Sequence, residues 1–224
     1  LLYKIQMEVP DQITLGEDSV VTYPCIAFSK KISIVDEYLY FYRQRASSML
    51  KMTKKSSVEI KNIIFMINFL IKQLKKSSNY DFSDQIQNYL VALSIIRTGG
   101  FLDNNDFIDG IFKNISIKEK KTVLYSSGAF GQQMYKQMNS NSYNLVGWID
   151  EDCFESKAQG LKVLPTYKIK DLNPELVIVA TLDETYFNEI LCKIKDFIGD
   201  NCIVAFPTLS KKHIEHYSKN LLNE

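Results

Sequence analysis

The feature that most constrains the fold is an alternation of short apolar segments with amphipathic ones between residues 119 and 208. The apolar segments are typical of buried strands, and the amphipathic ones are typical of helices. Strands are expected at 122–127, 144–150, 160–165, 176–181 and 202–206, and helices at 132–138 and 184–198. Continuous apolar strands that alternate with helices indicate a parallel sheet covered on both faces. With right-handed crossovers, this region is expected to form a small Rossmann-like α/β domain.

The first of these strands is followed by a turn, "SSGAFG", that opens a helix. In dinucleotide-binding folds such a turn lets the backbone approach a phosphate, and the helix N-terminus supplies unpaired N–H groups. Gly128 and Gly131 match the second and third glycines of that fingerprint, whereas Ser126 replaces the first. Asp150 ends the second strand, where an acid accepts hydrogen bonds from a ribose. The candidate ligand-binding residues are Ser126, Gly128, Ala129, Phe130, Gly131 and Asp150.

Two interpretations of this turn stay open. In the first, the turn binds a nucleotide, a nucleotide-sugar or NAD(P). In the second, its glycines only permit a tight turn and close helix–strand packing, and the bulky Phe130 stands inside the loop. Redox catalysis is disfavoured because no Tyr-x-x-x-Lys or comparable proton donor lies at a suitable place. Asp183 and Glu184 follow a strand at its carboxyl end, where α/β sheets bind ligands, but an N-cap role for Asp183 is favoured.

Two regions precede the α/β domain. Residues 1–52 show a strand-like, aromatic pattern, within which a helix is expected from Ser19 to Ser29. Residues 53–118 show a helical pattern. Its helices are expected from Val58 to Leu74, from an N-cap at Ser83 to a stop at Gly99-Gly100, and from Asn105 to Phe112. Residues 209–224 are expected to form a solvated tail that includes His213 and His216.

The quoted turn and the segments "NLVGWIDED", "GLKVLP" and "ELVIVAT" resemble a Rossmann-like module of bacterial surface-polysaccharide enzymes. The module is similar to the nucleotide-sugar-binding domain of sugar acyltransferases, and it is also appended to capsule glycosyltransferases and sugar methyltransferases. Its pattern includes a "V-G-φ-φ-D-D" strand end, here carried by Gly147, Asp150 and Asp152, and then a "G-x-x-V" element at Gly160 and Val163. The resemblance implies a nucleotide-sugar ligand without specifying the sugar. Because no hexapeptide repeat follows, acyl transfer by a β-helix is not expected.

The N-terminal region resembles the last quarter of a family-2, GT-A-type glycosyltransferase. In that family an acidic pair heads a helix, and a later strand ends in "Y-x-Y-R-x-x-x-x-S". Glu17 and Asp18 match the pair, and the closing signature is matched by Tyr40, Tyr42, Arg43 and Ser47-Ser48-Met49. The resemblance implies that Asp18, with Glu17 beside it, takes the proton of the acceptor hydroxyl. On the residues alone, the pair also fits acidic side chains that complement a helix dipole.

The resemblance departs from the family in one respect. The nucleotide-binding half of a GT-A fold, with its Asp-x-Asp metal motif, would precede this segment. The chain's Asp-x-Asp, at residues 150–152, lies in the α/β domain instead, and "DNND" at 103–106 fits turn chemistry. The chain is therefore expected to be the C-terminal part of a glycosyltransferase for capsule or cell-surface polysaccharide, inactive alone. A divalent metal is expected only in the upstream half, and the parent's acceptor is expected to be a polysaccharide.

Two alternatives belong to other functional classes. One is a non-catalytic nucleotide- or nucleotide-sugar-binding module that regulates or scaffolds polysaccharide assembly, and the less favoured one is a small NAD(P)-dependent oxidoreductase.

A formal net charge of +1 gives no field that would favour nucleic acid. Four dispersed cysteines suit a reducing cytoplasm. The apolar run 63–71 is too short to span a bilayer, although peripheral association with the inner face of a membrane stays open.

Overall fold

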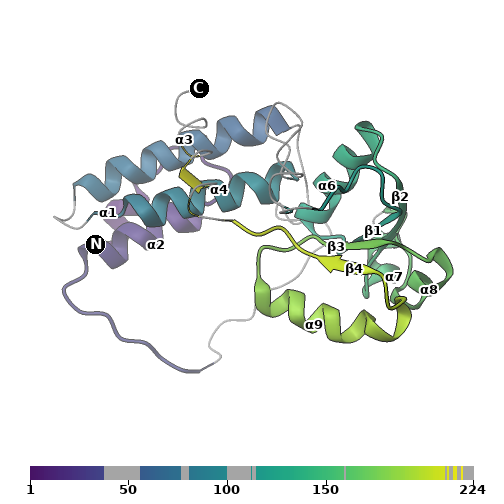
Figure 1. Cartoon of the computed structure of the whole chain (residues 1–224). Helices are drawn as coiled ribbons and strands as arrows, with labels where there is room; N and C mark the ends of the chain where they lie inside the picture. Colours follow the sequence, from purple (N-terminus) through teal and green to yellow (C-terminus); the bar gives the residue numbers. More distant parts are fainter. Residues whose placement is uncertain are drawn as a thin grey trace.

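The computed structural model shows a helical part and a sheet part (Figure 1). It describes residues 1–37, 56–76, 81–99, 112, 115–158, 160–209, 211, 214, 215 and 218. The helical part consists of α1 (Leu2–Gln6), α2 (Glu17–Phe28), α3 (Ser56–Lys75) and α4 (Ser83–Thr98). The strands are β1 (Thr122–Tyr125), β2 (Leu145–Ile149), β3 (Leu176–Val179) and β4 (Ile203–Ala205). The remaining helices are α6 (Ala129–Ser140), α7 (Cys153–Ala158), η1 (Thr166–Lys168), α8 (Ile169–Leu172), α9 (Glu184–Ile194) and η2 (Lys195–Phe197).

The four strands form one parallel sheet in the order β2-β1-β3-β4. The expected α/β fold with a Rossmann-like parallel sheet is therefore confirmed. The strand expected at 160–165 is reduced to a single parallel bridge between Leu164 and Ile149, on the outer side of β2. The chain moves outward from β1 to β2 and then returns to the opposite side of β1 with β3. The connections thus diverge between β1 and β3, the kind of place where open α/β sheets bind their ligands.

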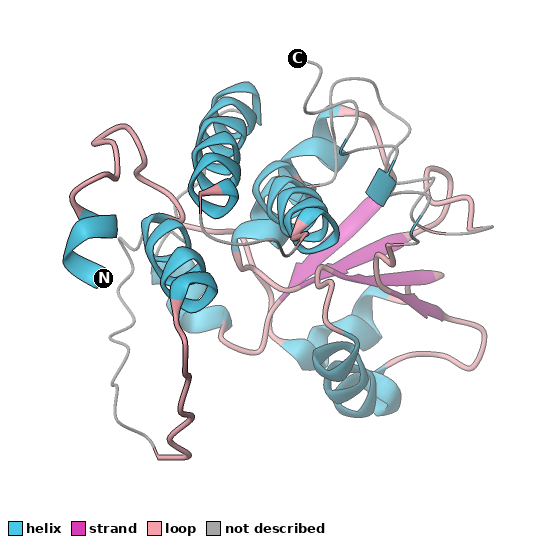
Figure 2. Cartoon of the chain, turned by 90° about the vertical axis from the view of Figure 1, so that its left-hand side faces the viewer, coloured by secondary structure: helices cyan, strands magenta, loops and turns pink. Residues whose placement is uncertain are grey.

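Helices cover both faces of the sheet, as expected (Figure 2). One face carries Leu124 and Ile178, which share a hydrophobic core with Met134 and Met138 of α6 and with Ile95 of α4. The other face carries a core formed by strand residues together with residues of α8 and α9: Val123, Tyr125, Ile149, Val177, Val179, Ile169, Ile190 and Ile194. The central strands β1 and β3 are buried on both sides, which explains why they lack the alternation of a half-exposed strand.

Helices α2, α3 and α4 share a second core. It contains Ile13 and Val20 from the N-terminal region, Ile63 and Ile67 from α3, and Leu90 from α4. The helix expected from Ser19 to Ser29 is confirmed as α2. The strand-like expectation for the rest of residues 1–52 is wrong where the structure describes that region, because residues 1–37 contain no strand and the alternating Ile32 and Ile34 are exposed. The limits at 52 and 118 stay a prediction.

The ends of α4 and α9 follow capping chemistry. Ser83 is the first residue of α4 rather than its N-cap, and Asp81 accepts hydrogen bonds from the Ser83 N–H (2.9 Å) and hydroxyl. Gly99 ends α4 as expected, with a left-handed φ of 74°. The Asp183 carboxylate accepts from the N–H groups of Thr185 and Tyr186, which confirms its N-cap role.

The two parts of the chain meet where α4 ends against α6 (Figure 1). A Cβ at Gly99 would lie 2.5 Å from the backbone nitrogen of Met134, so the two backbones touch there.

Several sequence expectations lie outside the described residues: Tyr38, Tyr40, Tyr42, Arg43, 47–49, 103–106, His213, His216 and nearly all of the helix at 105–112. No helix in the described ranges is long and apolar enough to cross a membrane.

Candidate functional site

A cleft of about 460 Å³ lies at the carboxyl ends of β1 and β2. It is lined by Ser126, Ser127, Gly128, Gln132, Asp150, Glu151, Asp152, Glu155, Ser156 and Tyr186. These residues come from the turn before α6, the first turn of α6, the segment after β2, helix α7 and the first turn of α9. The structure therefore brings Ser126, Gly128 and Asp150 of the predicted site together in one cavity.

Ser126 holds a backbone conformation that normally selects glycine. Its φ is 91°, which costs an L-residue of order 1–3 kcal/mol unless its surroundings fix it. Two hydrogen bonds do so: its N–H donates to the carbonyl of Ile149 (2.9 Å), and its carbonyl accepts from Trp148 Nε1–H (2.8 Å). The serine that replaces the first glycine of the fingerprint therefore retains the glycine-like turn.

The two glycines of the turn have different environments. A Cβ at Gly131 would lie 2.0 Å from the carbonyl oxygen of Ser126, so α6 begins in direct contact with the turn. A Cβ at Gly128 would meet only Ser126 Oγ, at 3.8 Å, and Gly128 is exposed in the cleft. Gly131 is thus required by packing, whereas Gly128 leaves the backbone open to a ligand.

Ala129 and Phe130 do not line the cleft. The Phe130 side chain is buried in the core between α6 and the sheet, and the expectation that it stands inside the loop is wrong. The cause is helix geometry: α6 begins at Ala129, earlier than expected, which turns Phe130 onto the apolar face. Gly128 is the N-cap of α6, and no side chain caps the helix. The first N–H groups of α6, which have no intrahelical partner, therefore lack a side-chain partner as well.

Asp150 spans the gap between β2 and the turn. Its Oδ2 accepts from the N–H (2.5 Å) and hydroxyl (2.8 Å) of Ser127, and its Oδ1 accepts from the N–H of Asp152 (2.8 Å). The buried Ser127 and Ser156 hydroxyls lie 2.7 Å apart and extend this network. A carboxylate has about four acceptor positions, so Asp150 retains about one for a ligand hydroxyl.

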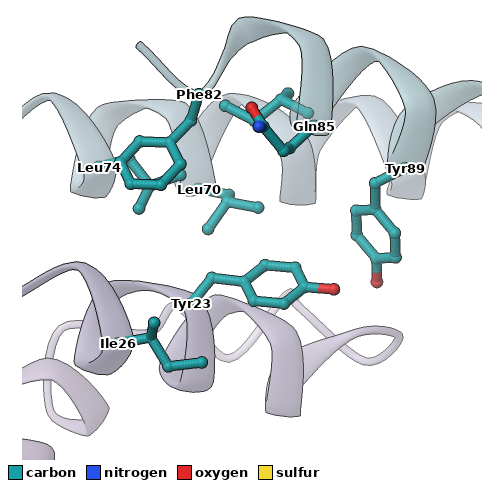
Figure 3. A pocket seen from close by; sticks show the side chains of 8 residues that line it. Tyr23, Ile26, Leu70, Leu74, Phe82, Gln85 and Tyr89 are labelled. Atoms are coloured by element: carbon teal, nitrogen blue, oxygen red, sulfur yellow. The ribbon is translucent and has the colours of Figure 1, made fainter. Parts of the chain in front are cut away.

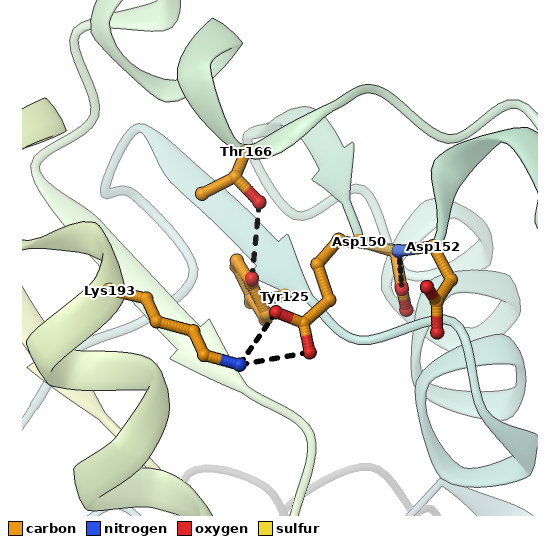
Figure 4. A network of polar contacts seen from close by, with 6 residues as sticks. Tyr125, Asp150, Asp152, Thr166 and Lys193 are labelled. Carbon is orange, nitrogen blue, oxygen red and sulfur yellow. Dashed lines mark hydrogen bonds and ion pairs between the residues drawn. The ribbon is translucent and has the colours of Figure 1, made fainter.

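The rim of the cleft on the β2 side is acidic. Glu151 is paired with Lys193 of α9 at 2.7 Å (Figure 4). Asp152 and Glu155 are exposed. Burial raises the pKa of Tyr186, and the negative charges of Asp150 and Glu151 raise it further. Behind the rim, Tyr125 Oη lies 3.2 Å from Thr166 Oγ1, and burial raises the pKa of Tyr125 to about 12. Both phenols therefore remain neutral at physiological pH.

Glu17 and Asp18 lie in the helical part, at the first turn of α2, and not at the cleft (Figure 1). Both are exposed, and Asp18 Oδ1 accepts from the N–H of Ser19 at 2.8 Å. The Ser19 hydroxyl in turn lies 2.9 Å from Tyr89 Oη on α4. In the described part of the chain, the pair is placed to complement the α2 dipole, and its expected role as base stays a prediction.

Sequence reasoning missed most of the cleft wall. Ser127, Gln132, Glu151, Glu155, Ser156 and Tyr186 were not assigned to it, and Trp148, expected to pack, also fixes the turn through its indole N–H. One signal was available: Asp150 follows β2 two residues after Trp148, so the alternation of the strand directs both to the same side of the sheet. Ser156 and Tyr186 follow separate strands, and only the folded chain shows that they line the same cleft.

No group of three or more His, Cys, Asp or Glu side chains in the described ranges is arranged to hold a metal ion. Within the cleft, Asp150 is engaged in the hydrogen bonds given above and Glu151 in the ion pair with Lys193. Comparisons of the chain with protein-family models, with curated proteins and with solved structures returned no match. The site is therefore interpreted from its own geometry.

A Ser126→Gly variant is expected to unfold with a free energy about 1 kcal/mol larger than that of the parent chain, because glycine adopts φ 91° without steric cost. Ser142→Gly is the matched control, since Ser142 also has a positive φ (59°) but lies in the turn after α6, away from the cleft. Urea unfolding followed by circular dichroism measures both. A destabilised Ser126→Gly chain alongside a stabilised Ser142→Gly chain would contradict a strained serine at the turn.

Proposed function

We propose that the α/β domain binds a nucleotide or nucleotide-sugar in the cleft at the β1–α6 turn, as a module of bacterial surface-polysaccharide synthesis. One observation carries the proposal: the exposed Gly128 and the uncapped N-terminus of α6 open into the cleft at the carboxyl edge of the sheet. Backbone N–H groups at such a helix start bind phosphate without a basic side chain. The Ser126 hydroxyl lies beside Gly128 and makes no hydrogen bond within the described chain.

The charge of the wall limits which nucleotide fits. The described lining contains four carboxylates and no lysine or arginine. Asp150 is compensated by three N–H or O–H donors and Glu151 by Lys193, and the side chain of Asp152 is exposed. Carboxylates accept hydrogen bonds from sugar hydroxyls and repel a further phosphate. The wall therefore favours a ligand with one diphosphate and free sugar hydroxyls over one with an additional phosphate, such as NADP.

Titration calorimetry with UDP-glucose, NAD and NADP tests the proposal. We expect saturable binding of UDP-glucose, weaker binding of NADP than of NAD, and at least a tenfold loss of UDP-glucose affinity in Gly128→Val. The branched side chain would occupy the space above the N-terminus of α6. Gly199→Val is the control, because an added Cβ there meets nothing within 4 Å. The proposal fails if none of the three nucleotides binds, or if Gly128→Val binds as tightly as Gly199→Val.

A second candidate function is glycosyl transfer by a longer protein that contains this chain. Its support is that α2 begins at Glu17, so that the acidic pair heads a helix as the GT-A resemblance implies. In that case Asp18 would take the proton of the acceptor hydroxyl, and the donor sugar would bind upstream. The test is the sequence that precedes Leu1 in the gene. A GT-A start with an Asp-x-Asp motif there is required, and its absence rejects this candidate.

A further inference from the structure

A second cavity lies in the helical part, where α2 and α4 separate above α3 (Figure 3). Its volume is about 280 Å³. Leu70 and Leu74 of α3 form the floor, α2 contributes one wall and α4 the other. The lining consists of Tyr23, Ile26, Leu70, Leu74, Phe82, Gln85, Ile86 and Tyr89. The cavity is thus bounded on three sides by helices and is not a flat apolar face.

The cavity ends at a pair of tyrosines. The rings of Tyr23 and Tyr89 meet edge to face, with centroids 5.8 Å apart. Tyr89 Oη lies 2.9 Å from Ser19 Oγ, and burial raises the pKa of the Tyr89 phenol. Tyr23 Oη makes no hydrogen bond within the described residues, and Figure 3 shows it pointing toward Tyr89. The tyrosine end therefore offers a hydroxyl, while the rest of the cavity is almost entirely aliphatic and aromatic.

Apolar side chains in this cavity remain in contact with water. Ile26 is 49% exposed and Tyr23 is 41% exposed, although the same helices bury Val20, Met66 and Leu90 almost completely one turn away. Exposed apolar area of this kind favours an occupant that removes it from water. No lysine, arginine, aspartate or glutamate belongs to the described lining, so a charged occupant would lose its hydration without gaining an ion pair.

We propose that this cavity is a binding site for an uncharged, mainly apolar small molecule, a chain or ring carrying one hydroxyl or carbonyl group that reaches Tyr23 Oη. A cavity of 150 Å³ holds benzene, so 280 Å³ accommodates about a dozen non-hydrogen atoms. An α-helix with its side chains is about 10 Å wide, and its bulk would lie over this cavity rather than inside it. The size and the uncharged lining therefore favour a small neutral ligand over a docked helix.

This site is independent of the proposed nucleotide cleft. Its residues belong to α2, α3, α4 and the residue before α4, whereas the cleft is built from the turn before α6, α6 itself, the segment after β2, α7 and α9. No residue lines both cavities. Loss of one function by substitution can therefore be measured without loss of the other.

The probe for this site is 1-decanol, a neutral chain of about the required size with one hydroxyl. Methyl NMR spectra of the full chain are expected to show saturable shifts of the Ile26 and Ile86 methyl groups, with Ile190 in the core of the sheet part unchanged. Decanoate, which carries a carboxylate in place of the hydroxyl, is expected to bind at least tenfold more weakly because the described lining supplies no cation.

Ile26→Lys places a charge at the mouth of the cavity on a half-exposed position, and it is expected to weaken decanol binding at least tenfold while the chain stays folded. Val58→Lys is the matched control, because Val58 is similarly exposed (41%) on α3 but does not line the cavity. Absence of any saturable methyl shift in the parent chain overturns the proposal. A dimer that Ile26→Lys dissociates, with no decanol binding, would assign the cavity to a second copy and also overturn it.

Discussion

A Gly131→Ala variant is expected to lose about 3 kcal/mol of unfolding free energy, because its methyl group would lie 2.0 Å from the carbonyl oxygen of Ser126 and 2.8 Å from its carbonyl carbon. Neither atom can move away easily. The Ser126 carbonyl already accepts from the Trp148 indole, and the Ser126 N–H is bound to Ile149. Alanine in a helix gains only about 1 kcal/mol over glycine, which does not offset this clash. Urea unfolding measures the loss.

Gly128→Ala is the matched control, three residues away in the same turn. Gly128 has φ −60° and ψ 178°, which any residue adopts, and its Cβ would have only Ser126 Oγ nearby, at 3.8 Å. Its unfolding free energy is expected to change by less than about 0.5 kcal/mol. Equal destabilisation by the two alanines would contradict the assignment of Gly131 to packing and of Gly128 to the ligand.

This contrast separates the shape of the turn from its occupancy. Packing at Gly131 and the hydrogen bonds at Ser126 fix the turn whether or not a ligand is present. Nothing in the packing requires glycine at Gly128, so a need for glycine there would come from a bound molecule. Stability measurements on Gly131 and binding measurements on Gly128 therefore address two different questions about one motif.

The sheet part was predictable from sequence because its signals are local and agree with one another. The two central strands, β1 and β3, are buried on both faces, and the glycine turn, Asp150 and Asp183 stand at strand ends or helix starts where such residues have defined roles. Only the short segment at 160–165 was overestimated, since it pairs with β2 through Leu164 alone.

The N-terminal region was less predictable because its structure depends on distant residues. The helix at Val20 was expected, but its burial against α3, which begins 36 residues later, was not readable from local sequence. The alternation at Ile32 and Ile34 favours a strand, yet both side chains are exposed and form none. The contacts of the cleft residues were also hard to predict, because they too depend on distant parts of the chain. Asp150 was expected at this edge, but its bonds to Ser127 follow from the pairing of β1 with β2, and Ser156 and Tyr186 reach the cleft through the placement of α7 and α9. Periodicity carries no information about such contacts.

Arg97→Met is expected to cost about 3–5 kcal/mol of unfolding free energy, because it leaves a buried carboxylate without its cation. Arg97 of α4 and Glu59 of α3 are 4% and 2% exposed, and two hydrogen bonds join them, Nη2 to Oε1 at 2.7 Å and Nε to Oε2 at 3.2 Å. Lys76→Met is the control, since Lys76 pairs with Glu8 at the surface of the same helical part. Its expected cost is below about 1 kcal/mol.

The double variant Glu59→Leu/Arg97→Met determines whether the pair stabilises the fold or only avoids a penalty. If the large cost of Arg97→Met comes from an unpaired buried charge, removing both charges restores part of the lost stability, and the double variant is more stable than the single one. Urea unfolding of the four chains measures the coupling. A double variant less stable than the parent chain would instead make the pair a net source of stability between α3 and α4.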